Sequence, residues 1–318
     1  HMKVIEHLDK AKDTVISFEI IPPKRGGDIK ALLAVLDEII KYNPPFIDIT
    51  SHAAEVIYEE TPNGGYKMKV KRKRPGTLGI CALIQNKYNV DAVPHVICHG
   101  FTREETEDFL IELHYLGIDN VLAIRGDDNG YHKPIKFGRS VNHYAVDLVK
   151  QIADVNKGKY IEDTLLDAKP MNFCVGVGGY PEKHFEAPNL AVDIKYTKEK
   201  VDAGAEYIVT QMFYDNKNYF NYIEKCKDAG ITVPIIPGLK IVTSKKQLQS
   251  VPKHFYIDLP DALTEEIEKA KPEHVVDIGV QWTAKQVEDL LNKNVPAIHF
   301  YIMQDPKPIN MLMNKLKL

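Results

Sequence analysis

The chain has 318 residues, of which 44% are hydrophobic and 27% charged, the balance of an ordinary globular protein. Its formal net charge is −3, so no overall basic field points to a nucleic-acid partner. No apolar stretch reaches the roughly 18 residues that a membrane span needs, and no signal peptide is recognisable. These features favour a cytoplasmic protein that binds neither nucleic acid nor membrane.

Residues 3–318 are expected to form one domain, and His1 and Met2 look like the remnant of an expression tag. The sequence contains no H-E-x-x-H motif and no C-x-x-C pair, so no metal site is expected. We expect free thiols in a reducing compartment at all four cysteines, namely Cys81, Cys98, Cys174 and Cys226.

Short apolar runs rich in Val, Ile and Phe alternate with longer amphipathic stretches along the chain. The runs expected to be strands are 14–20, 46–50, 92–98, 120–127, 172–180, 207–215, 232–242 and 296–304. The expected helices include 28–43, 77–88, 102–117, 142–155, 189–205, 216–230 and 244–255. Near-continuous apolar strands are typical of a parallel sheet covered on both faces. Eight strand–helix repeats therefore predict an α/β fold, a single-domain (β/α)₈ TIM barrel.

A doubly wound open sheet is the structural alternative. That fold usually carries a G-x-G-x-x-G fingerprint after its first strand. The sequence there reads SFEIIPPKRGGD, from Ser17 to Asp28, and lacks the fingerprint. The barrel is therefore the better prediction.

Polar side chains gather where the predicted strands end. They are Glu19, Thr50, His95, His99, Arg125, Asp127, Tyr180, Gln211, Tyr301 and Gln304. Strand ends are often exposed to solvent, which by itself explains a polar residue at any one of these positions. Barrel enzymes place their active sites at the carboxyl ends of the strands, so the whole set predicts a site there.

Glu19 is the least ordinary of these residues, because it interrupts the apolar run SFEII. An isolated carboxyl in apolar surroundings has its pKa raised by desolvation and can stay protonated near neutral pH. The sequence therefore predicts a general acid at Glu19. The other polar groups suit a large polar cofactor. Lys240 is the only fair candidate for a Schiff-base lysine.

Six motifs occur in a distinctive order. They are SFEIIPPK, PHVICHG, NVLAIRGDD, GGYPEKHFEA, KVDAGAEYIVTQMFYD and PIIPGL. From Phe18 to about Tyr301 the chain resembles the methylenetetrahydrofolate reductases of the bacterial type, which consist of the catalytic barrel alone. The resemblance implies a FAD-dependent barrel that reduces 5,10-methylenetetrahydrofolate to 5-methyltetrahydrofolate with NADH or NADPH, by ping-pong hydride transfer through the flavin. A homo-oligomer is also possible.

The resemblance assigns roles to individual residues. Glu19 matches the acid that protonates the folate, and Asp127 matches an aspartate beside the flavin N1 and C2 carbonyl. The positions expected to bind FAD are Thr50, His95, Ile124, Arg125, Gly126, Asp127, Gly178, Tyr180, His184, Asp193 and Lys200. Among them, Arg125, His184 and Lys200 are the groups that can carry positive charge beside the pyrophosphate. The folate is expected to contact Glu19, Gln211 and Tyr301.

Ordinary explanations remain for three of these residues: Asp127 could cap a turn, Lys200 could lie on an exposed helix face, and His184 could face solvent. Two departures from the family pattern also affect the folate site. Lys245 stands where the family has a stacking aromatic, so we expect stacking from Phe213, Tyr214 or elsewhere. Asp305 replaces an arginine that could meet the folate tail.

The basic run at 67–76 is expected to be a mobile solvated loop. Alternatively, it attracts the folate tail or the dinucleotide phosphates. Two other functions also stay open, another barrel flavoenzyme such as a proline dehydrogenase-like oxidoreductase and a non-catalytic flavin- or folate-binding barrel.

Overall fold

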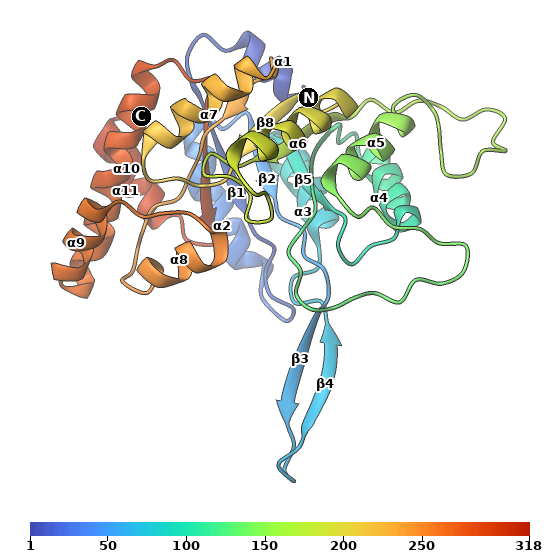
Figure 1. Ribbon diagram of the computed structural model, residues 1–318, viewed down its shortest axis with the longest axis horizontal. Helices are drawn as coiled ribbons and strands as arrows, with labels where there is room; N and C mark the ends of the chain where they lie inside the picture. The colour runs from blue at the N-terminus through green and yellow to red at the C-terminus, as the bar shows by residue number, and fades with distance from the viewer.

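The computed structural model describes residues 1–318 and contains one parallel sheet that curves into a barrel, with helices around it (Figure 1). The barrel strands are β1 (Val15–Ile20), β2 (Phe46–Ile49), β5 (Asp91–Ile97), β6 (Asn120–Ile124), β7 (Cys174–Gly179), β8 (Tyr207–Thr210), β9 (Ile235–Ile236), β10 (Gly238–Leu239) and β11 (Ala297–Met303). Their order in the sheet is β10-β11-β1-β2-β5-β6-β7-β8-β9, and every neighbouring pair is parallel.

Most of the helices follow strands, as the expected repeat requires. They are α1 (Val4–Lys10), α2 (Ile29–Ile39), α3 (Thr77–Leu83), α4 (Arg103–Tyr115), α5 (Ala145–Val155), α6 (Leu190–Ala203), α7 (Asn216–Asp228), α8 (Gln247–Phe255), α9 (Asp261–Lys269), α10 (Val275–Asn292) and α11 (Lys307–Leu316). Local caps set several boundaries. Thr102 Oγ1, for example, accepts a hydrogen bond from the Glu105 N–H, and the Glu105 carboxylate accepts one from the Thr102 N–H, which fixes the start of α4.

The barrel closes at one short segment, 235–239. β9 pairs with β8, and β10, just past Pro237, pairs with β11. Since proline has no N–H to donate, the ladder is interrupted there and the chain switches neighbours. The single strand predicted at 232–242 is thus two short strands, and the prediction of a (β/α)₈ barrel is confirmed.

Two apolar clusters sit on opposite faces of the sheet. The larger one lies between strands and helices and includes Phe18, Ile47 and Val121. The smaller one is formed by side chains of the opposite parity on the same strands, such as Phe46 and Leu122, and fills the barrel interior. Toward the carboxyl ends of the strands, the inward positions become polar.

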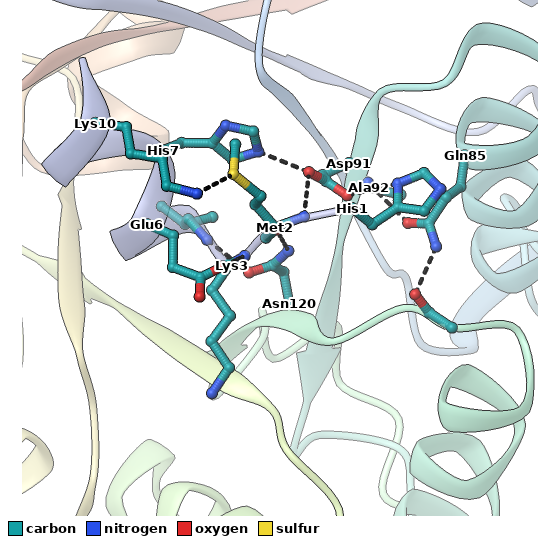
Figure 2. Close-up of polar contacts among 12 residues, drawn as sticks. His1, Met2, Lys3, Glu6, His7, Lys10, Gln85, Asp91, Ala92 and Asn120 are labelled. Atoms are coloured by element: carbon teal, nitrogen blue, oxygen red, sulfur yellow. Dashed lines mark hydrogen bonds and ion pairs between the residues drawn. The ribbon is translucent and has the colours of Figure 1, made fainter. Parts of the chain in front are cut away.

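The N-terminal segment makes polar contacts with Asp91 and Asn120, the first residues of β5 and β6, at the opposite end of the strands (Figure 2). Val4 is fully buried in the interior cluster, and its N–H donates to Asn120 Oδ1 at 2.8 Å. The His7 Nε2 atom lies 2.6 Å from one Asp91 oxygen, and His1 Nδ1 lies 2.8 Å from the other. The attribution of residues 1 and 2 to a tag stays a prediction, although both contact the barrel here.

An antiparallel hairpin of β3 (Glu55–Glu60) and β4 (Tyr66–Lys71) projects from the barrel (Figure 1). The expectation of a loop was therefore wrong over residues 67–71. The missed signal is an alternation of period two, because Tyr66, Met68 and Val70 occupy one face while lysines occupy the other. Lys69 pairs across the strands with Glu59 at 2.5 Å.

Candidate active site

Two carboxylates on neighbouring strands point into the barrel near its open end. Glu19 of β1 and Asp48 of β2 are register partners, so both side chains project from the same face of the sheet. Side-chain exposure is 12% for Glu19 and 1% for Asp48. His95 of β5 lies between them, with its Nε2 atom 3.4 Å from an oxygen of each carboxylate.

A second histidine approaches Glu19 from the other side. His299 of β11 is the register partner of Ser17, and its Nδ1 atom is hydrogen-bonded to Ser17 Oγ at 2.8 Å. Its Nε2 atom lies 3.8 Å from the Glu19 carboxylate and has no hydrogen-bond partner. Glu19 is thus flanked by two imidazoles, so its surroundings are not simply apolar.

This environment overturns the expected direction of the Glu19 pKa. Burial raises the pKa of Glu19, but the nearby charges of His95, His299 and Lys240 oppose it and hold the pKa below its ordinary value. Burial lowers the pKa of His95, but Glu19 and Asp48 outweigh it and leave the pKa raised. Glu19 is therefore a carboxylate in the free protein, and its charge favours the protonated form of the His95 imidazole.

Tyr301 and Gln211 complete this end of the barrel. Tyr301 is the register partner of Glu19, and its hydroxyl donates to the Thr210 carbonyl at 2.5 Å. Gln211 follows β8, where its side-chain oxygen accepts from the Met212 N–H at 3.0 Å. The side-chain NH₂ group of Gln211 makes no intramolecular hydrogen bond.

The wall beside this cluster is built from β7 and α6. Lys200 is buried, and its Nζ donates to the Gly178 carbonyl at 2.7 Å. Burial lowers the pKa of Lys200 to about 8, partly offset by Asp193. Asp193 is also buried, and its carboxylate accepts from the His184 N–H at 2.9 Å. Lys200 therefore does not lie on an exposed helix face.

Arg125, at the end of β6, reaches this wall through a two-pronged ion pair with Glu186. The His184 ring packs edge-on against Tyr180, with 4.7 Å between ring centroids. Burial lowers the pKa of His184, so this side chain is neutral near pH 7. Of the three groups expected to be able to carry positive charge, His184 is therefore the uncharged one at this pH, and the role of all three beside a pyrophosphate stays a prediction.

The remaining cofactor candidates line the same end of the barrel. Gly126 has φ +86°, and a Cβ there would lie 3.2 Å from the side chain of Ile97, so glycine lets the chain turn closely after Ile124. Asp127 follows and is exposed. Thr50 Oγ1 and His52 Nε2 are hydrogen-bonded at 2.8 Å at the end of β2.

The expected substitutes for the missing aromatic are wrong. Phe213 is fully buried and stacks on Tyr219, and Tyr214 is 2% exposed. Lys245 donates to the Glu268 carbonyl at 2.8 Å, and Asp305 accepts from the Lys307 N–H at the start of α11. These local contacts explain both residues without a ligand.

Several residues of the interior cluster were missed from the sequence, namely Ser17, Asp48 and His299, and Lys240 was considered only as a Schiff-base lysine. Ser17 lies two positions before Glu19, and His299 two before Tyr301. This spacing places each pair on one face of its strand and is the signal that could have found them.

Other classes of site find less support. No group of three or more His, Cys, Asp or Glu side chains is arranged to hold a metal ion, and all four cysteines are buried and unpaired. None of the helices combines the length and apolar character needed to cross a membrane.

The fold and its polar clusters define an α/β-barrel protein with its candidate site at the carboxyl ends of the strands. The chain belongs to the methylenetetrahydrofolate reductase family, whose model matches residues 3–317.

Curated relatives occur in eukaryotes and bacteria. "Methylenetetrahydrofolate reductase (NADH) 1" of Arabidopsis thaliana is 31% identical over 98% of this chain, and "Methylenetetrahydrofolate reductase 1" of Schizosaccharomyces pombe is 30% identical over 98%. The chain spans 50% and 47% of these proteins, about half their length. The Escherichia coli "5,10-methylenetetrahydrofolate reductase" is 28% identical, with 91% of this chain and 86% of that protein covered.

A solved structure from Clostridium thermocellum shares the fold. It is described as an uncharacterised protein that binds two copies of 5-methyl-5,6,7,8-tetrahydrofolic acid. The TM-score is 0.59, at 14% identity and with 99% of this chain and 98% of that chain covered.

Proposed function

We propose that this protein reduces 5,10-methylenetetrahydrofolate to 5-methyltetrahydrofolate, with FAD as bound cofactor and NADH or NADPH as reductant. The carrying observation is the position of Glu19, a nearly buried carboxylate between two imidazoles at the open end of a barrel of this family. In this proposal Glu19 takes up a proton and passes it to a substrate bound at this end of the barrel.

The wall formed by β7, α6 and Arg125 at the end of β6 fits a flavin dinucleotide. Lys200 and Arg125 supply positive charge for a diphosphate, and Gly126 and Gly178 leave the strand ends free of side chains. When bound, FAD would supply the hydride chemistry by accepting a hydride from the nicotinamide and delivering it to the one-carbon unit. The residues of this chain bind, orient and exchange protons.

Glu19 would donate a proton to the bridging nitrogen of the substrate. The histidine charges lower its pKa in the free protein, but a substrate ring over the carboxyl would remove its remaining water and raise the pKa. Gln211 and Tyr301 are suited to orienting the substrate, because both lie at the same end of the barrel as Glu19. The amide of Gln211 can hydrogen-bond a pterin edge.

The Glu19→Gln variant tests this role, because it keeps the shape and removes the acid. Flavin reduction by NADH should stay within about twofold of the parent, while the folate half-reaction should slow by about 10²–10⁴-fold. Stopped-flow absorbance under anaerobic conditions measures each half separately. Equal loss in both halves would contradict the assigned role.

A further inference from the structure

Asp48 is a buried carboxylate to which the proposed reaction assigns no role. Its Oδ2 atom has no hydrogen-bond partner, and neither does the facing Nε2 atom of His95, 3.4 Å away. An unpaired carboxylate in a barrel interior is costly, so a counter-charge is needed nearby. His95 is the only basic side chain within ion-pair distance of Asp48.

The other ionisable groups around this pair come from several elements of the barrel. They are Glu19 of β1, His52 after β2, Cys81 of α3, Tyr207 of β8, Lys240 after β10, and His299 and Tyr301 of β11. Lys240 and His299 act on Glu19, from the side opposite His95. The Cys81 thiol and the Tyr207 and Tyr301 hydroxyls, whose pKa values are all raised well above normal, stay neutral near pH 7.

We propose that Asp48 is a positioning residue that keeps a proton on His95, and that this proton is transferred to Glu19 for each folate reduction. The inference rests on the proposed function and adds a source for the proton that Glu19 delivers. It is carried by geometry, because the Nε2 atom of His95 lies 3.4 Å from an oxygen of each carboxylate, so that a proton on Nε2 can pass to either of them. Catalytic hydrogen bonds in free proteins are often long in this way and tighten when substrate binds.

The proton transfer balances in two moves. The N–H bond of His95 breaks and an O–H bond forms on Glu19, which leaves a neutral imidazole beside Asp48. The O–H bond of Glu19 then breaks as a new N–H bond forms on the bridging nitrogen of the substrate. After product release, His95 takes a proton from water, drawn back by the charge of Asp48.

The Asp48→Asn variant removes the charge at nearly constant volume, and Asp48→Ser serves if the amide prevents folding. Asp91→Asn is the matched control, since Asp91 is a buried carboxylate that also faces histidine but lies at the opposite end of the barrel. The titration of His95 is followed by NMR of histidine-labelled protein without folate. Its signal among the 12 histidines is identified by its loss in His95→Gln.

The proposal predicts that the midpoint of the His95 titration falls by about one pH unit or more in Asp48→Asn and is unchanged in Asp91→Asn. One pH unit corresponds to about a tenfold change in proton affinity. The folate half-reaction of Asp48→Asn should then lose about tenfold in rate above the new midpoint, while flavin reduction by NADH is unchanged. An unshifted His95 midpoint, or a shifted midpoint with a parental pH profile, overturns the proposal. The unsubstituted protein could instead fail to reduce methylenetetrahydrofolate although the His95 midpoint does shift in Asp48→Asn. That result would overturn the proposal that His95 supplies a proton for folate reduction, and it would place the fault in the substrate assignment.

Discussion

The guanidinium of Arg125 is held by the carboxylate of Glu186 through two parallel hydrogen bonds of 2.7 and 2.9 Å. A diphosphate that binds Arg125 must therefore compete with Glu186. We therefore expect the free protein to bind a diphosphate more weakly than the charge of Arg125 alone would suggest.

The Glu186→Gln variant should bind FAD up to about fivefold more tightly, because releasing an exposed ion pair changes the free energy by roughly 0.2–1 kcal/mol. Flavin fluorescence titration measures the effect. Asp202→Asn is the control, because it breaks an exposed ion pair with Lys198 on α6. Weaker binding by Glu186→Gln would mean that Glu186 positions Arg125 for the cofactor instead of competing with it.

Binding of FAD should depend on the charge of Lys200. Because burial lowers its pKa to about 8, affinity should be constant between about pH 6 and 7.5 and fall as the pH rises through 8. The Lys200→Met variant should bind weakly with no such step, and Lys198→Met should keep it. A step at the same pH in Lys200→Met would assign the titration to another group.

The same residue has an opposite effect on folding of the cofactor-free protein. The pKa of Lys200 is about 8 when folded and 10.5 ordinarily, so between these values the unfolded chain binds more protons. The contribution of Lys200 to the free energy of unfolding therefore rises with pH across this window. Urea titrations at several pH values should show this rise in the parent and not in Lys200→Met.

The closing segment of the barrel cannot accept a larger residue at Gly238. A Cβ there would lie 2.4 Å from the Thr210 carbonyl oxygen and 2.6 Å from the Tyr301 ring. We expect Gly238→Ala to lower the free energy of unfolding by about 1–3 kcal/mol, as overpacking does. Gly79→Ala in α3 meets no atom within 4 Å and should be stabilising, by about 0.5–1 kcal/mol. Urea denaturation compares the two, and a loss in both would indicate that the close contacts at Gly238 are not the cause.

Much of the barrel was predictable because strand and helix patterns are local. All eight expected strand runs overlap a strand of the barrel, and the polar ends of those strands do lie together. The motifs around Glu19, Arg125 and Gln211 were likewise readable from short stretches.

The charge state of the site was not predictable, since it depends on register between strands. Glu19 looks isolated in SFEII, yet His95 and His299 reach it from 76 and 280 residues along the chain and lower its pKa. Asp48 was missed for the same reason, because only the pairing of β1 with β2 places it beside Glu19. The burial of Lys200 depends in turn on how α6 packs.

The visible spectrum of the purified protein under anaerobic conditions, with NADH added first and methylenetetrahydrofolate second, tests both halves of the proposed reaction. We expect a flavin absorbance band that bleaches with NADH and returns with the folate. A band that bleaches but is not restored would contradict the folate assignment. A colourless protein that FAD cannot reconstitute would contradict the proposed flavoenzyme itself.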